Sequence, residues 1–167
     1  MKIVMIHRWC IILLLALLSQ PVLAQNHKNS RRNENYMPTK EGTPGYYDDK
    51  VRHLFKQGLW GTGKTLLDEG LSKYETVSAL NELMGAYWLH YKKYDKARYF
   101  LIRSLRDDNK NPQTLQMLMK VEEMTQHYSS AIVYCNNLLE LTPYEYTLWR
   151  KKIELFRLQG NNVEATR

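Results

Sequence analysis

Small and apolar residues recur between Ser78 and Pro143 with a period of 34 positions. Alanines mark this period at Ala97 and Ala131, and the period continues beyond Pro143 to Ala165. Two of them share three further columns, an aromatic residue three positions before the alanine and apolar residues four and eight positions after it. These columns hold Tyr94 and Tyr128, Leu101 and Cys135, and Leu105 and Leu139. A period of this length is typical of stacked helical hairpins, so the pattern predicts an all-α array.

Each period has the spacing of two amphipathic helices joined by a short turn. Pro44 and Pro112 stand at first helical positions, where the missing N–H breaks no hydrogen bond. The pattern predicts helices over Pro44–Gln57, Gly61–Tyr74, Ser78–Tyr91, Asp95–Asp108, Pro112–Thr125 and Ser129–Leu141, with another from about Tyr146 to Leu158. In pairs, they form repeats at about 44–77, 78–111 and 112–145, followed by an incomplete repeat at 146–167.

These repeats resemble the tetratricopeptide repeat (TPR), a 34-residue helix–turn–helix unit with small residues at its eighth, twentieth and twenty-seventh positions. One repeat holds Gly85, Ala97 and Ser104 at those positions. Small residues are needed where two helices cross, because a large side chain would hold the backbones apart. The resemblance implies a right-handed superhelical solenoid of antiparallel helix pairs.

Later repeats depart from the TPR pattern at two positions. Met119 and Ile153 replace the small eighth residue, and Glu122 stands where an aromatic residue is usual. We expect looser packing at these positions. The alternative is an ordinary helical bundle, but evenly spaced alanines alone do not explain the parallel columns.

The first 24 residues have the three parts of a secretory signal peptide, with basic residues first, an apolar run next and Ala24 last. The apolar run from Trp9 to Leu18 is ten residues long, whereas a membrane-spanning helix needs roughly 20. We therefore expect cleavage after Ala24, with a retained membrane anchor as the alternative. Residues 25–43 follow as a polar leader whose composition is typical of disordered segments.

The signal peptide predicts export, with the periplasm or the cell envelope as the destination. It contains two of the 24 Lys and Arg residues and none of the 17 Asp and Glu residues, so the mature chain keeps 22 against 17, a net charge of +5. This modest excess, without interleaved aromatic residues in the leader, does not indicate a nucleic-acid partner. We expect membrane contact only through the signal peptide or a further C-terminal domain.

The chain ends two residues after Ala165, where a solenoid would still need a terminal capping helix. We therefore expect the sequence to be the N-terminal part of a longer cell-envelope protein. A catalytic domain in the remaining part is one alternative function, and more repeats are another possibility.

A second alternative comes from residues 58–65, which fit the phosphate-loop motif G-x-x-x-x-G-K-[ST] with Gly58, Gly63, Lys64 and Thr65 at its defining positions. Such a loop holds nucleotide phosphates through backbone N–H groups, and it follows a buried parallel strand. Here the apolar residues before the motif have helical spacing. The 34-residue register also places Gly63 in the alanine column. We interpret the motif as the turn of a divergent first repeat, with nucleotide binding as the alternative.

No other catalytic, cofactor-binding or metal-binding residues are predicted, and we expect no enzyme activity in these 167 residues. The five histidines are scattered, and none forms the i, i+4 pair typical of a metal site. His90 and His127 are interpreted as helix-end residues. Cys135 is the one cysteine outside the signal peptide, and its column predicts a small buried hydrophobe rather than a reactive thiol.

Proteins with this repeat bind an extended peptide or a partner helix in a concave groove lined by the first helix of each repeat. When the groove positions of the family are transferred to the 34-residue register of this sequence, they include both acidic and basic residues. They are Asp48, Arg52, Phe55, Glu82, Ala86, Leu89, Gln116, Lys120, Glu123, Arg150, Glu154 and Arg157. The resemblance implies a scaffold for protein–protein interaction with a protein or peptide partner. A spacer array whose groove binds nothing is the alternative.

Overall fold

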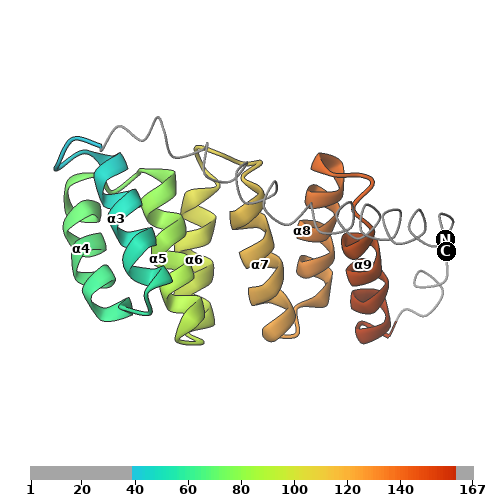
Figure 1. Ribbon diagram of the computed structural model, residues 1–167. Helices are drawn as coiled ribbons and strands as arrows, with labels where there is room; N and C mark the ends of the chain where they lie inside the picture. The colour runs from blue at the N-terminus through green and yellow to red at the C-terminus, as the bar shows by residue number, and fades with distance from the viewer. Residues whose placement is uncertain (1–38, 161–167) are drawn as a thin grey trace, which may run out of the picture. The chain divides into compact units, whose positions relative to one another are not determined.

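The computed structural model describes residues 39–160, and every regular element in this range is an α-helix (Figure 1). The helices are α3 (Pro44–Lys56), α4 (Trp60–Lys73), α5 (Ser78–His90), α6 (Tyr94–Ser104), α7 (Pro112–Met124), α8 (Tyr128–Leu141) and α9 (Tyr146–Leu158). Helix α3 packs on α4, α5 on α6, and α7 on α8, and each pair also contacts the next one. The predicted all-α array of helix pairs is confirmed.

The predicted signal peptide (1–24) lies outside the described residues, as does most of the predicted leader (25–43). Within residues 39–160, no helix is both long enough and apolar enough to cross a membrane.

Two of the first helices begin at a proline with a side-chain cap before it. The Thr43 hydroxyl accepts a hydrogen bond from the Tyr46 N–H at 3.4 Å, and the side-chain oxygen Oδ1 of Asn111 accepts one from the Thr114 N–H at 3.0 Å. Each cap satisfies a backbone donor that the first helical turn leaves free. The starts predicted from Pro44 and Pro112 are therefore confirmed.

The turn after each first helix contains a residue in the left-handed conformation, always at the same position of the repeat. Its φ is +77° at Gly58, 56° at Lys92, 62° at Gln126 and +84° at Gly160. In the first three turns, the next residue donates its N–H to the carbonyl five positions earlier, which closes the helix end in a Schellman motif. These bonds are Leu59 to Leu54 (2.9 Å), Lys93 to Trp88 (2.9 Å) and His127 to Glu122 (2.8 Å).

Helix α6 ends at Ser104, although the sequence pattern predicted it as far as Asp108. The Ser78 hydroxyl donates a hydrogen bond to the Ser104 carbonyl at 2.8 Å. Asp107, Asp108 and Asn109 then follow, and residues of these types favour turns because their side chains compete for backbone hydrogen bonds. The predicted end of this helix was therefore wrong by four residues.

Small residues do lie where the helices cross, as the register requires. Ala97 and Ala131 are both fully buried. A Cβ atom added to Gly85 would lie 2.5 Å from the Leu101 side chain, so α5 and α6 approach too closely for a larger residue. Met119 is half-buried and Ile153 is 37% exposed, so neither large eighth-position residue is fully enclosed.

Candidate functional site

The residues that match the phosphate-loop motif form the turn between α3 and α4 and the start of α4. Gly58 is the left-handed residue of the turn, and the chain is helical from Trp60 onward. Gly63 is buried, and a Cβ atom there would lie 2.6 Å from the Phe55 ring. The Thr65 hydroxyl donates to the Gly61 carbonyl at 3.3 Å. The motif thus follows a helix and continues into one, whereas a phosphate loop follows a strand.

Lys64 is engaged with other side chains of the repeat array. Its ammonium group forms an ion pair with Asp68 at 2.6 Å. It also lies 5.8 Å from the ring centroids of both Tyr87 and Trp88 in the next repeat. Its position is therefore that of a residue linking two repeats.

Half of the predicted groove residues line a hollow of about 430 Å³ between α3, α5 and α7, which we call the groove hollow. Its wall includes six of them, namely Arg52, Glu82, Ala86, Leu89, Gln116 and Lys120, and adds Leu83, Gln113 and Met117. Residues separated by up to 68 positions in the sequence thus line one surface, because the first helices of three successive repeats lie side by side.

The floor of the groove hollow is fixed by a buried carboxylate. Glu82 is 4% exposed, and its two oxygens accept hydrogen bonds from Arg52 Nη2 at 2.9 Å and from the Thr114 hydroxyl at 3.0 Å. Arg52 Nε also donates to Asp48 at 2.9 Å. One carboxylate therefore connects three helices, and pairing satisfies a charge that would otherwise be costly to bury.

The pKa values of Asp48 and Arg52 are shifted by burial and by the contacts of this hydrogen-bond network. Burial raises the pKa of Asp48, although the neighbouring Arg52 guanidinium opposes this effect. Burial acts to lower the pKa of Arg52, but the hydrogen bond to Glu82 and the charge of Asp48 outweigh it and raise the pKa. Arg52 is thus a charged residue whose charge is already compensated by the protein.

The groove hollow continues into a second hollow at the end of α5. The two share Ala86, Leu89, Met117 and Lys120, and the second adds His90, Lys92, Tyr94 and Met124. The shared surface combines apolar side chains with the exposed Lys120 ammonium. Among residues 39–160, Lys120 has no ion pair or side-chain hydrogen bond. Such a surface can bind an extended segment that offers apolar side chains and a carboxylate.

Solved structures match the chain, although no protein-family model and no curated protein sequence does. MamA AMB-1 matches with a TM-score of 0.66 and 20% identity over 74% of this chain and 73% of its own. Another crystal structure of MamA has a TM-score of 0.68 and 13% identity over 74% of this chain and 68% of its own. The Arabidopsis OM64 TPR domain has a TM-score of 0.62 and 16% identity over 68% of this chain and 94% of its own.

The described chain has the TPR fold. At these identities, the similarity establishes the fold alone.

One residue predicted to line the TPR groove lies in the core instead. Phe55 is 9% exposed and stacks on Trp60, with 4.4 Å between ring centroids, and on Tyr87 at 6.2 Å. The absence of a side chain at Gly63 leaves room for its ring. Phe55 therefore joins α3 to α4 and α5, and its assignment to the groove was wrong.

Four other predicted groove residues lie apart from the groove hollow. Glu123 forms an ion pair with Lys151 at 3.1 Å, which ties α7 to α9. Arg150, Glu154 and Arg157 line a separate hollow along α9. These four residues do lie on the first helix of a repeat, as the 34-residue register predicts. The structure does not bring them together with Arg52 or Lys120.

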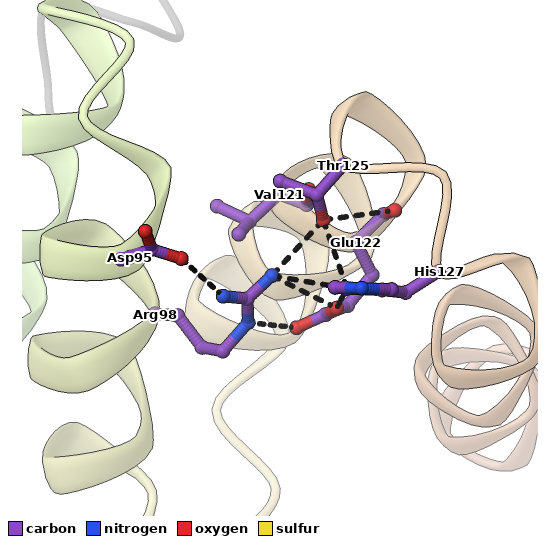
Figure 2. Close-up of polar contacts among 6 residues, drawn as sticks. All are labelled: Asp95, Arg98, Val121, Glu122, Thr125 and His127. Carbon is purple, nitrogen blue, oxygen red and sulfur yellow. Dashed lines mark hydrogen bonds and ion pairs between the residues drawn. The ribbon is translucent and has the colours of Figure 1, made fainter.

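A polar cluster between α6 and α7 was not predicted as such (Figure 2). Arg98 Nε donates to Glu122 Oε1 at 2.7 Å, and Arg98 Nη2 contacts Oε2 at 3.2 Å and the Thr125 hydroxyl at 2.9 Å. His127 Nδ1 lies 3.0 Å from Glu122 and 3.2 Å from Arg98, and its tautomer decides which contact is a hydrogen bond. Asp95 pairs with the outer side of the guanidinium at 2.9 Å. The departure of Glu122 from the TPR pattern was the only sequence signal for this cluster.

The remaining candidates have structural surroundings. Cys135 is fully buried, burial raises the pKa of its thiol, and its Sγ donates to the Leu148 carbonyl at 3.4 Å, so the prediction of a small buried hydrophobe is confirmed. His90 ends α5, and His127 immediately precedes α8, as expected. In the described part of the chain, no three or more His, Cys, Asp or Glu residues are grouped to hold a metal ion.

Proposed function

We propose that the protein is an interaction scaffold that binds an extended segment of a partner protein in the groove hollow. The observation that supports this proposal is the convergence of Arg52, Ala86, Leu89, Gln116 and Lys120 from three helices on one open surface. TPR solenoids offer such surfaces because their helix pairs repeat along one direction. The groove residues come from rigid helices, which favours recognition without large rearrangement.

The chemistry of the hollow favours a particular kind of segment. Ala86, Leu89 and Met117 offer apolar contact, and the flexible thioether of methionine adapts to different side chains. Gln113 and Gln116 can donate to and accept from a peptide backbone. Lys120 supplies a positive charge that no ion pair compensates among residues 39–160. We therefore propose an extended peptide with apolar side chains and a carboxylate opposite Lys120.

A library of displayed peptides tests this function. Peptides selected on the wild type should lose binding to Ala86→Glu, because the new carboxylate enters the apolar surface of the hollow. The matched control is Val133→Glu, which adds the same side chain at an exposed position of α8. Both variants should keep the helical circular dichroism spectrum of the wild type. Equal binding of the selected peptides to both variants would contradict a groove-based function.

We also propose that the protein is exported and acts in the periplasm or cell envelope, on the basis of the signal-peptide pattern in residues 1–24. When the full-length sequence is expressed in cells with a periplasm, mass spectrometry of the periplasmic fraction should show a mature chain beginning at Gln25. Recovery of only full-length protein from the cytosolic fraction would refute export, and it would leave the groove proposal unaffected.

A further inference from the structure

The first helices of the four repeats carry different charges at their groove positions. At the fifth and sixth positions of the TPR unit, the residues change from acidic through uncharged to basic along the array. In order from α3 to α9, these two columns hold Asp48 and Asp49, Glu82 and Leu83, Gln116 and Met117, and Arg150 and Lys151. The members on α5 and α7 line the groove hollow, and those on α9 line the hollow along that helix.

The other two groove columns leave this gradient in place. They hold Arg52 and Phe55 on α3, Ala86 and Leu89 on α5, Lys120 and Glu123 on α7, and Glu154 and Arg157 on α9. Over all four columns, α3 has two acidic residues against one basic, α5 has one acidic, α7 has one of each, and α9 has three basic against one acidic. The net charges of these columns are therefore −1, −1, 0 and +2 from the first repeat to the last.

Ion pairs at the α3 end leave an excess of negative charge. Arg52 pairs with Asp48 and with Glu82, each at 2.9 Å, so one guanidinium serves two carboxylates. The bond from Arg52 uses Oδ1 of Asp48, and the Asp48 side chain is still 24% exposed. A basic side chain of a partner would therefore find a carboxylate here whose charge is only partly compensated.

Ion pairs at the α9 end leave an excess of positive charge. Lys151 pairs with Glu123 at 3.1 Å and with Glu154 at 2.8 Å. Arg150 and Arg157 are exposed and have no acidic partner within residues 39–160. The pair between Lys151 and Glu123 also links α7 to α9, so one extended segment can pass from the groove hollow to the hollow along α9.

From this gradient we infer that the partner segment is dipolar and binds with a fixed charge order. Its basic side chains lie toward α3, its apolar side chains pack over Leu89 and Met117, and its acidic side chains lie toward Lys120 and α9. This inference rests on the proposed groove function and specifies the partner. Packed helices lie about 8–10 Å apart, so about nine extended residues reach from α3 to α9. A segment with one sign of charge would meet like charge at one end, which disfavours its binding.

Three capped peptides with the same apolar centre test the charge order on the full chain. The dipolar peptide has lysines at one end and glutamates at the other, the second peptide has lysines at both ends, and the third has glutamates at both ends. By fluorescence anisotropy at low salt, the dipolar peptide should bind about tenfold tighter than either of the others. This preference should shrink in about 0.5 M salt, because salt screens exposed charges. A photoreactive benzoylphenylalanine beside the lysines should cross-link to α3, and one beside the glutamates should cross-link to α9.

A pair of matched double variants assigns the preference to the groove. Arg150→Glu with Arg157→Glu makes the α9 end acidic, so the peptide with lysines at both ends should now bind at least as tightly as the dipolar one. Arg106→Glu with Lys110→Glu changes the total charge equally in the exposed loop between α6 and α7, and it should leave the order of affinities unchanged.

Several results would overturn the inference. They are equal affinity of the wild type for the three peptides, tighter binding of a peptide with one sign of charge, cross-links from the lysine end to α9, or no binding of any of the three. None of them decides the proposed groove function, which the library selection and the Ala86→Glu variant test separately. Loss of selectivity between Ala86→Glu and Val133→Glu would instead remove both proposals.

Discussion

Trp88 and Glu122 occupy equivalent positions in successive TPR units, 34 residues apart, yet one is an aromatic ring and the other a buried carboxylate. Each contacts a cation from the second helix of the preceding repeat. The Lys64 ammonium lies 5.8 Å from the Trp88 ring, and Arg98 pairs with Glu122 at 2.7 Å. Lys64 and Arg98 are themselves 34 residues apart. The two repeats thus make the same inter-repeat contact with different chemistry.

The comparison shows why a TPR position usually filled by an aromatic residue can hold an acid. Glu122 is 5% exposed, and a buried carboxylate is tolerated only when paired and hydrogen-bonded. Arg98 supplies a bidentate partner for it, whereas the uncharged, half-buried indole of Trp88 requires no counter-ion and gains from a nearby cation. In the next repeat the equivalent residues are Ile132 and Phe156, which belong to one apolar cluster. In all three repeats the two residues thus match each other, as a cation with an aromatic ring, a cation with an acid, or two apolar side chains.

Among the variants of this contact, the substitution of Arg98 should lower the unfolding free energy most. Arg98→Met leaves the Glu122 carboxylate buried without its main partner, and we expect a loss of about 3 kcal/mol in unfolding free energy. This is the low end of the range for such a change, because Arg98 is partly exposed and Thr125 remains nearby. Urea denaturation followed by circular dichroism measures it.

The double variant Arg98→Met with Glu122→Leu is the control. It replaces the ion pair with apolar side chains, as the Ile132 and Phe156 repeat already has, and it should recover most of the lost stability. If the double variant were less stable than Arg98→Met alone, the hypothesis that an apolar pair can replace the Arg98–Glu122 ion pair would be wrong.

The eighth position of the TPR unit provides a second comparison, between a glycine at a helix crossing and a glycine with open space around it. Gly85→Ala should destabilise by about 2 kcal/mol, because the new Cβ atom would lie 2.5 Å from Leu101 and the core must shift. Gly61→Ala is the matched control in α4, where an added Cβ meets nothing within 4 Å. It should be neutral or stabilise by up to about 0.5 kcal/mol, because Gly61 lies in the first turn of α4 and glycine costs most in the middle of a helix. Melting curves that ranked the two variants in the opposite order would contradict this crossing.

Substitution of Lys64 should change the unfolding free energy less than substitution of Arg98, which occupies the equivalent position in the next repeat. Lys64→Met removes an ion pair with an exposed aspartate and a distant contact with the Trp88 ring, so we expect a change of less than about 1 kcal/mol. Calorimetric titration of the wild type with ATP and magnesium should show no binding that depends on Lys64. Micromolar binding that disappears in Lys64→Met would revive the phosphate-loop hypothesis.

The smallest effect is expected from the hydrogen bonds of Glu69 on α4, whose side chain is 53% exposed. Hydrogen bonds from Lys73 and from Tyr47 lower the pKa of Glu69. The folded state therefore favours the ionised carboxylate, and this stabilisation is present above the unfolded pKa of about 4.3 and is lost as the pH falls through the lowered value. The melting temperature of the wild type should fall slightly more between pH 5.5 and 3.5 than that of Glu69→Gln. Identical pH profiles would show that this contact contributes nothing.

The candidate site was predictable only in part. The register placed Arg52, Ala86, Leu89 and Lys120 on first helices, and three of those helices do form one surface. Phe55 was misplaced because a helical register gives the face of a residue but not whether a glycine opposite leaves room for its ring. The left-handed turn column was missed because Lys92 and Gln126 fill two of its four positions.

The sequence by itself determined the number and order of the described helices, their bounds to within a few residues, and the small residues at their crossings. These features depend on local periodicity and on turn chemistry that repeats every 34 positions. Only the tertiary structure decided which polar side chains find partners. Arg98 contacts Glu122, and Lys64 and Lys96 contact Trp88, because the two residues of each contact lie on helices that pack side by side. The periodicity of the sequence predicts the helices, but it does not predict which side chains reach one another between them.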